Sequence, residues 1–282
     1  MTARDRRGFT MVELIVALIL LLVVGGGMYS MLVGVQRISR RQTEISVLQG
    51  GLRTGLQLVQ SELQEVAANS GTGQSDILSM SGSAFSYRAM RGLGETCAVT
   101  GSAVKVRQSS WSGLRSPAGP RESLFLFVDG ADSASTADDS WMRVDGPTIT
   151  TSTCPDASPA WSFAVTLSAG QLATIRAPGP VRTFESMELG RITDDGQDWL
   201  GMRSISAGEG VLVPVVGPVT ANGVGFAYYD INGATTTTAS AVKMIVITLR
   251  GITQFQANAG MSGQLARRVD SLSVRVQLRN AL

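Results

Sequence analysis

Glu13 is the residue near the N-terminus that most clearly indicates a functional role. It is the only charged side chain between Phe9 and Val35. A carboxylate within an apolar segment costs about 2.5–3.5 kcal/mol at the centre of a bilayer, so it requires a compensating partner. If the chain is cut between Gly8 and Phe9, the new α-ammonium lies at a helix N-terminus, where the helix dipole disfavours positive charge. Glu13 lies one helical turn further on, and its carboxylate can pair with that ammonium, most usefully on a neighbouring copy or a related subunit.

The apolar segment that contains Glu13 is long enough to cross a membrane. The 22 residues from Leu14 to Val35 make a helix of roughly 33 Å at a rise of about 1.5 Å per residue, against about 30 Å for a hydrocarbon core. A conventional signal peptide or a single-pass anchor is the alternative. A secretory signal has a shorter apolar core, of about 7–15 residues, followed by a small-residue cleavage site. No such site follows before Arg37.

The residues at the junction resemble a known processing site. Arg6-Arg7-Gly8-Phe9-Thr10-Met11-Val12-Glu13-Leu14 is similar to the cleavage site of type IV prepilins and type II secretion pseudopilins. The likeness depends on the junction, the glutamate and the apolar run occurring together at fixed spacing. It implies that a prepilin peptidase/methyltransferase cuts between Gly8 and Phe9 and methylates the α-amine of Phe9. It also implies that Phe9 and Glu13 take part in assembly with other major and minor pilins or pseudopilins.

The orientation in the membrane also comes from this resemblance. Positive charges do not decide it, because three arginines precede the span and three follow it: Arg4, Arg6 and Arg7, then Arg37, Arg40 and Arg41. The resemblance implies a single-pass protein of the cytoplasmic (inner) membrane, with the N-terminus inside and the head outside. Such a protein later enters an extracellular or periplasmic filament.

Composition argues against several classes of function. The chain has 24 Lys and Arg against 22 Asp and Glu, a net charge of +2 and no histidine, so broad electrostatic attraction to nucleic acid is not expected. Serine hydrolases usually need a histidine base, and a zinc site needs more ligands than two cysteines. We therefore expect no enzyme, no metal site and no cofactor.

Two further sets of residues have a functional and a simpler interpretation. The clustered acids could hold calcium or act as paired carboxylates, but they lack the spacing of a calcium loop and are more simply solvated loop residues: Asp129, Asp132, Asp138, Asp139, Asp194, Asp195 and Asp198. The tryptophans could form a sugar-stacking platform, but packing in or around the core is the simpler role: Trp111, Trp141, Trp161 and Trp199.

The two cysteines, Cys97 and Cys154, both follow the membrane segment. If this part of the chain lies outside the cytoplasm, the oxidising compartment favours a disulfide between them. Closing a loop of this length stabilises a fold by roughly 4 kcal/mol in the chain-entropy model. Two unpaired thiols are the alternative.

A second periodic segment continues the helix beyond the span. Apolar residues recur at helical spacing, which predicts one buried stripe of an amphipathic helix: Ile45, Leu48, Leu52, Leu56, Val59, Leu63 and Val66. Glycines within this stem, Gly25-Gly26-Gly27, Gly50-Gly51 and Gly55, weaken a helix. The triplet either loosens locally to serve assembly or permits close helix packing in the membrane.

The predicted organisation is a leader of residues 1–8, a stem of 9–66 (membrane-spanning over 9–36, amphipathic over 37–66) and a β-rich extracytoplasmic head of 67–282.

Beyond the stem the helical period stops and short runs typical of strands follow. The predicted strands are Ser123–Val128, Trp161–Leu167, Gln171–Arg176, Val211–Val216, Gly225–Asp230, Val242–Leu249 and Ser271–Leu278. The last of these alternates between apolar and polar residues, which predicts one buried and one exposed face. The fold class is therefore α+β, with a long N-terminal helix packed on a mostly antiparallel β head, as in pilins.

The distal strands add a second resemblance. Val215 to Val219, Val224 to Gly233 and Ala241 to Leu249 are similar to the strand–turn–strand end of W-type minor pilins and J-type minor pseudopilins. The turn residues Asp230-Ile231-Asn232-Gly233 predict a hairpin here. The resemblance implies a minor pilin with a priming or tip role in motility, adhesion or DNA uptake, or a J-type pseudopilin of protein secretion. A membrane-anchored module whose head binds a surface is the alternative from another class.

The processing prediction is tested by intact-mass and peptide mass spectrometry of the protein recovered from its own host. We expect a mature chain that begins at Phe9 with one methyl group on its α-amine. A Gly8→Val variant serves as the control, since a bulky residue before the scissile bond is expected to leave the leader attached. A mature protein that retains Met1 to Gly8 would contradict the prediction.

Overall fold

The computed structural model describes residues 10–68, 75–113, 115–130, 139–254, 257–258 and 265–279. It contains a long N-terminal helix, α1 (Met11–Leu63), and a large antiparallel sheet, which confirms the predicted α+β class. The chain divides into two compact units, one made of Met1–Gln49 with Thr253–Arg268 and the other of Gly50–Ile252 with Val269–Leu282. Because α1 has no break, one helix contributes to both units.

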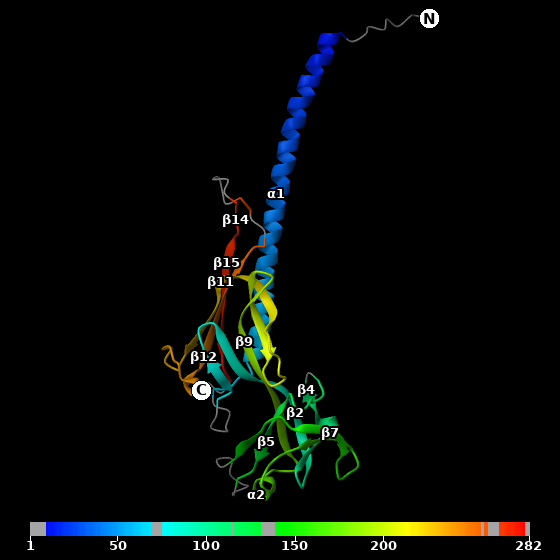
Figure 1. Cartoon of the computed structure of the whole chain (residues 1–282), viewed down its shortest axis with the longest axis vertical. Helices are drawn as coiled ribbons and strands as arrows, with labels where there is room; N and C mark the ends of the chain where they lie inside the picture. The colour runs from blue at the N-terminus through cyan, green and yellow to red at the C-terminus, as the bar shows by residue number, and fades with distance from the viewer. Residues whose placement is uncertain are drawn as a thin grey trace, which may run out of the picture. The chain divides into compact units, whose positions relative to one another are not determined.

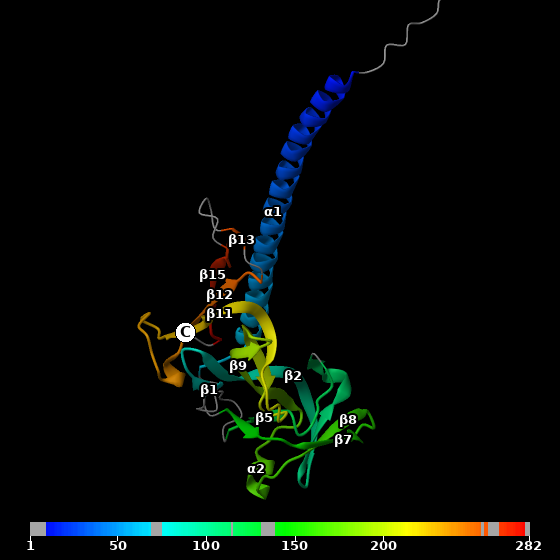
Figure 2. The same cartoon turned by 45° about the horizontal axis from the view of Figure 1, so that its top comes forward.

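The first unit consists of the N-terminal part of α1 and a short hairpin. By length and composition α1 can cross a membrane, since its mean hydropathy reaches 2.5 over an 18-residue window. The glycine triplet from Gly25 to Gly27 is helical, and a Cβ atom added at any of the three would meet nothing within 4 Å. Strands β13 (Ala257–Asn258) and β14 (Leu265–Ala266) pair antiparallel in the same unit. Figures 1 and 2 both show them beside α1.

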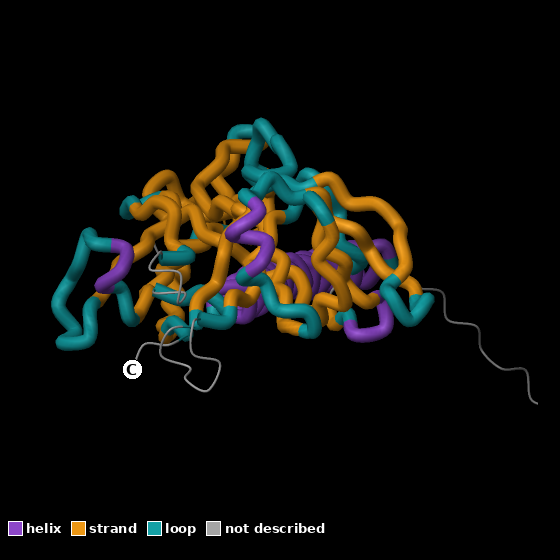
Figure 3. The backbone as a smooth tube through the Cα atoms, turned by 90° about the horizontal axis from the view of Figure 1, so that it is seen from below, coloured by secondary structure: helices purple, strands orange, loops and turns teal. Residues whose placement is uncertain are grey.

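The second unit is built around a 13-stranded sheet. Along its main path, hydrogen-bonded neighbours follow in the order β15 (Val269–Gln277), β12 (Met244–Ile252), β11 (Val213–Tyr229), β10 (Gln197–Ser204), β9 (Gly179–Asp194), β2 (Ala84–Thr100), β3 (Ala103–Arg107), β8 (Pro159–Ala164) and β7 (Thr148–Thr153). Strands off this path are β1 (Ile77–Met80), β4 (Ser112–Gly113), β5 (Ser123–Val128) and β6 (Ser140–Val144). Figure 3 shows these strands in orange, with the helical segments in purple.

The two central strands, β2 and β9, hold the sheet together. They pair antiparallel from Ala84 opposite Gly190 to Thr96 opposite Gly179. Strand β11 then joins two partners, because its first part pairs with β10 and its second part with β12. The register shifts between Val219 and Val224 of β11. An irregularity of this kind interrupts the ladder locally and bends the strand.

Most predicted strands lie in observed strands. Ser123–Val128 is β5, and the runs at Trp161, Val242 and Ser271 overlap β8, β12 and β15. Residues 271–278 alternate between exposed and at least half-buried positions, which confirms the predicted pattern. Val211–Val216 and Gly225–Asp230, predicted as two strands, overlap the single strand β11.

The strand predicted at Gln171–Arg176 is wrong. Residues Ala169–Ala173 form a short helix, α2. Ser168 Oγ accepts a hydrogen bond from Gln171 N at 3.3 Å, and Gln171 Oε1 accepts one from Ser168 N at 3.0 Å. This capping box satisfies two backbone donors at the start of a helix, so local side-chain bonding outweighs the β-like composition.

The predicted distal hairpin is confirmed. Strands β11 and β12 pair antiparallel, with Tyr228 opposite Ile245 and Tyr229 opposite Met244. Asp230 Oδ1 accepts hydrogen bonds from the backbone of Asn232 and Ala234, each at 2.9 Å. Gly233 has φ of 75°, a left-handed conformation that glycine adopts without strain.

The part of α1 in the second unit packs against the sheet through its apolar stripe. Leu52, Leu56, Val59 and Leu63 are each at most 3% exposed, as the helical spacing predicts. Gly55 marks the closest approach, because a Cβ atom there would lie 2.2 Å from Cγ2 of Val216 on β11. This glycine therefore permits contact between helix and sheet rather than acting only as a weak point of the helix.

A pair of glycine substitutions tests this contact. Gly51→Ala adds a methyl group to an exposed helical position with nothing within 4 Å, so we expect it to stabilise the protein by about 0.8–1 kcal/mol. Gly55→Ala brings the same propensity gain but drives a methyl group into Val216, so we expect a net loss of about 1–3 kcal/mol. Thermal unfolding of the full chain in detergent measures both, and a Gly55→Ala protein as stable as the parent would contradict the packing argument.

Candidate processing and assembly site

Thr10 and Glu13 form a reciprocal set of hydrogen bonds at the start of α1. Glu13 Oε2 accepts from Thr10 N at 2.9 Å and from Thr10 Oγ1 at 3.0 Å, and Thr10 Oγ1 accepts from Glu13 N at 3.3 Å. This is a capping box, in which a threonine and a glutamate three residues later satisfy each other's backbone donors. Gly8 and Phe9, the predicted processing residues, lie outside the described residues.

The geometry gives Glu13 a partner that sequence reasoning overlooked. The pattern Thr-x-x-Glu before an apolar run is itself a signal for a helix start, so Thr10 could have been identified. The carboxylate oxygen lies 2.9 Å from Thr10 N, the amide directly after Phe9. A carboxylate held here lies within one residue of the α-ammonium that a cut before Phe9 would create.

The segment after this cap offers an apolar surface on all sides. Every residue from Met11 to Leu32 is exposed in the chain alone. An apolar surface of this extent marks contact with lipid or with other proteins. The apolar N-terminal helix thus supports membrane anchoring.

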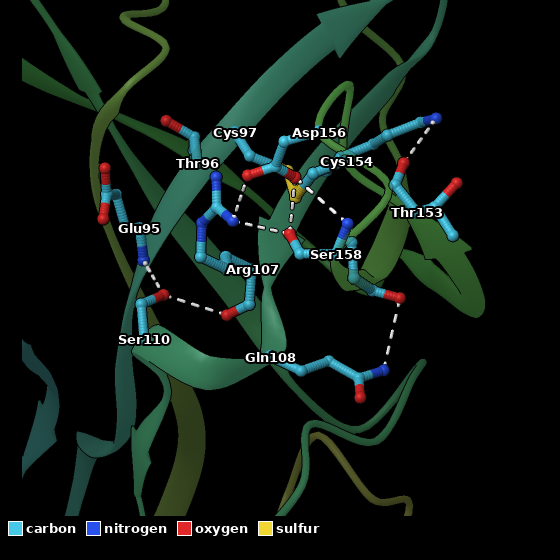
Figure 4. The surroundings of a disulfide bond; sticks show 12 residues. Glu95, Thr96, Cys97, Arg107, Gln108, Ser110, Thr153, Cys154, Asp156 and Ser158 are labelled. Carbon is cyan, nitrogen blue, oxygen red and sulfur yellow. Dashed lines mark hydrogen bonds and ion pairs between the residues drawn. A yellow bond between two sulfur atoms is a disulfide. The ribbon is translucent and has the colours of Figure 1, made fainter.

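The structure joins Cys97 and Cys154 in a disulfide, with their Cα atoms 5.7 Å apart. Cys97 lies on β2 and Cys154 directly follows β7, so the bond ties a central strand to the edge of the sheet. Figure 4 shows Arg107, Asp156 and Ser158 beside it. Hydrogen bonds from Ser158 and Arg107 lower the pKa of Asp156 to about 2, so the Arg107–Asp156 pair stays ionised in all but strongly acidic solution.

The tryptophans make separate packing contacts. Among the described residues, Trp111 packs edge-on against Trp161, with ring centroids 5.3 Å apart, and also covers Gly92 and Gly94. Trp141 packs against Phe127 and under the guanidinium of Arg182, and Trp199 lies over Gly217. These contacts support a packing role rather than a shared stacking platform.

Three of the clustered acids, Asp129, Asp139 and Asp198, are held by local partners. Asp129 pairs with Arg176, Asp198 with Arg191 and Thr193, and Asp139 accepts from the backbone of Gly130. Asp194 and Asp195 lie at the turn between β9 and β10, whereas Asp132 and Asp138 lie outside the described residues. Within the described ranges, no three of His, Cys, Asp and Glu gather in a way that could hold a metal ion.

A buried network of ion pairs fixes the helix to the sheet. Arg91 on β2 pairs with two glutamates: its Nη2 lies 2.7 Å from Oε1 of Glu62 on α1, and its Nε lies 2.6 Å from Oε2 of Glu185 on β9. Nη2 of Arg115 lies 3.1 Å from Oε1 of Glu185, and Arg121 also forms an ion pair with Glu185. Glu185 is 2% exposed. Burial alone would raise its pKa, but hydrogen bonds from Arg91 and Arg121 overcome this and the pKa of Glu185 lies below its usual value.

Comparison with known proteins bears on the N-terminal site. Residues 3–29 match the family model described as the prokaryotic N-terminal methylation motif. No curated protein and no solved structure gives a match. The motif match covers the junction, Glu13 and the first part of the apolar helix, and it supports a relation to type IV pilins and pseudopilins.

Substitution of Glu185 tests the buried network. Glu185→Gln leaves three arginines around a neutral side chain, so we expect a loss of about 3 kcal/mol in unfolding free energy. The matched control is Glu188→Gln on the same strand, whose partner Arg203 is 30% exposed, and we expect it to cost at most about 1 kcal/mol.

The effect of Glu185→Gln depends on pH in a defined direction. Because the folded pKa of Glu185 is lowered, its contribution is present above the ordinary glutamate pKa of about 4.3 and is lost as pH falls through the folded pKa. The stability difference between parent and variant should therefore shrink in acid when measured by urea unfolding. A difference that grows in acid would contradict this role.

Proposed function

We propose that this chain is a minor type IV pilin-like subunit that is processed by prepilin peptidase after Gly8 and assembled into a pilus or pseudopilus. In this proposal residues 1–8 are the leader, 9–66 the stem and 67–282 the head outside the cytoplasmic membrane. Its role is to prime the filament or to occupy its tip, in motility, adhesion or DNA uptake. The chain acts through assembly and not as an enzyme.

The proposal depends on one combination of features. The methylation-motif match covers residues 3–29, and it continues into a helix exposed from Met11 to Leu32 and buried through one stripe from Leu52 to Leu63. The exposed part needs an apolar partner. In a pilin-like subunit, lipid supplies this partner before assembly and neighbouring helices supply it afterwards.

The second candidate is a J-type minor pseudopilin of type II protein secretion. The hairpin of β11 and β12 is part of the resemblance to both J-type pseudopilins and W-type minor pilins. It therefore supports both candidates equally. A deletion strain separates the two candidates. Loss of surface filaments favours the pilin, and loss of protein secretion with filaments intact favours the pseudopilin.

Two substitutions of Glu13 test its role in assembly. Glu13→Gln keeps an oxygen that can accept the hydrogen bonds of Thr10 but has no charge for the Phe9 ammonium, whereas Glu13→Val loses both. If charge pairing drives incorporation, both variants should fall at least about tenfold in the filament fraction, the change that 1.4 kcal/mol produces. The head should still fold with its disulfide formed.

Glu44→Gln is the matched control, because Glu44 lies on the same helix beyond the span, and it should assemble normally. Quantitative immunoblotting of sheared filaments measures all three variants. Normal incorporation of Glu13→Val would count against the proposal. Rescue by Glu13→Gln alone would show that the helix cap, and not the charge, is what assembly requires.

A further inference from the structure

A group of arginines lies immediately after the membrane-spanning part of α1. The apolar run ends at Val35, and the group consists of Arg37, Arg40 and Arg41. These arginines lie two to six residues beyond Val35, or about 3–9 Å along the helix. Spacings of three and four place them on one side of the helix. Within the described part of the chain none of them has an ion pair, and Arg37 and Arg40 are exposed.

The β13–β14 hairpin adds charge of the same sign to this unit. The segment Thr253–Arg268 contains no acid and ends in Arg267 and Arg268, both exposed. It belongs to the same compact unit as the first part of α1, and Figures 1 and 2 show β13 and β14 beside that helix. Together with residues 36–49 the unit presents five arginines and a single acid, Glu44, beyond the span.

We propose that Arg37, Arg40, Arg41, Arg267 and Arg268 form a cationic collar that binds the phosphate groups of anionic phospholipids in the leaflet facing the head. The end of the span sets the collar at the depth of the lipid headgroups. Guanidinium groups bind phosphate through paired hydrogen bonds. An arginine close to an anionic membrane surface contributes roughly fivefold in association.

The collar has a consequence that depends on the proposed processing. Removal of residues 1–8 takes away Arg4, Arg6 and Arg7, so the arginines that remain near the bilayer all lie on the head side of the span. Lipid phosphates then fix the depth of the mature helix from that side. The collar itself requires only that α1 spans a membrane, because lipid binding needs no filament.

The test measures lipid preference of the full mature chain in phosphatidylcholine vesicles, with spin-labelled phosphatidylglycerol or spin-labelled phosphatidylcholine as the probe. We expect the motionally restricted fraction to show at least a fivefold preference for phosphatidylglycerol at physiological salt. The preference should fall most in Arg37→Gln/Arg40→Gln/Arg41→Gln, less in Arg267→Gln/Arg268→Gln, and disappear when all five arginines are replaced. Glutamine retains high helix propensity, so α1 should remain folded.

Arg53→Gln is the matched control, since Arg53 is exposed on the same helix but lies about 18 Å beyond Arg41, more than two Debye lengths at physiological salt. It should leave the preference unchanged. Equal association of the two lipids with the parent, or a preference that the triple substitution leaves unchanged, would overturn the collar. Weaker filament incorporation of the triple variant with unchanged lipid preference would overturn it too, and would assign the arginines to a neighbouring subunit.

Resistance to alkaline extraction is measured on the same vesicles. A chain that is extracted by alkali would contradict both the span and the collar. A chain that resists extraction but shows no lipid preference would contradict the collar alone, so the two failures are distinguishable.

Discussion

The close contact between α1 and the sheet is the interaction on which the rest of the second unit depends. Gly55 lets the helix backbone approach Val216 of β11, and Leu52, Leu56 and other stripe residues are buried beside it. Glu62 then pairs with Arg91, which links the helix through Glu185 to both central strands. Apolar packing supplies non-directional burial, whereas the ion pairs fix one arrangement, because a buried charge without its partner is costly.

Features set by local periodicity could be predicted from the sequence. The stripe from Leu52 to Leu63, the turn at Asp230 to Gly233 and the alternation after Ser271 each depend on residues close together in the chain. The α+β class followed from these signals. The helix cap at Thr10 could also have been predicted from the sequence, because its partner Glu13 lies three residues away.

The central strands could not be predicted in this way, because their interior is not simply apolar. Arg91 on β2 and Glu185 on β9 are buried. From the sequence alone, charged residues such as these are predicted to lie on the surface, because their partners are not known. Gly92 and Gly94 in β2 suggest a break, but in the fold they make room for Trp111. The ion-pair network likewise joins residues 62, 91 and 185, a separation that no local pattern encodes.

The N-terminal site is the feature that connects this fold to a proposed function, because the motif of residues 3–29 occurs on a helix that carries a folded head. The most direct measurement is peptide mass spectrometry of purified filaments from the native host. The account predicts an N-terminal peptide that begins with N-methylated Phe9, at an abundance far below that of the main subunit. A chain confined to the membrane fraction in cells that make normal filaments, and absent from those filaments, would contradict it.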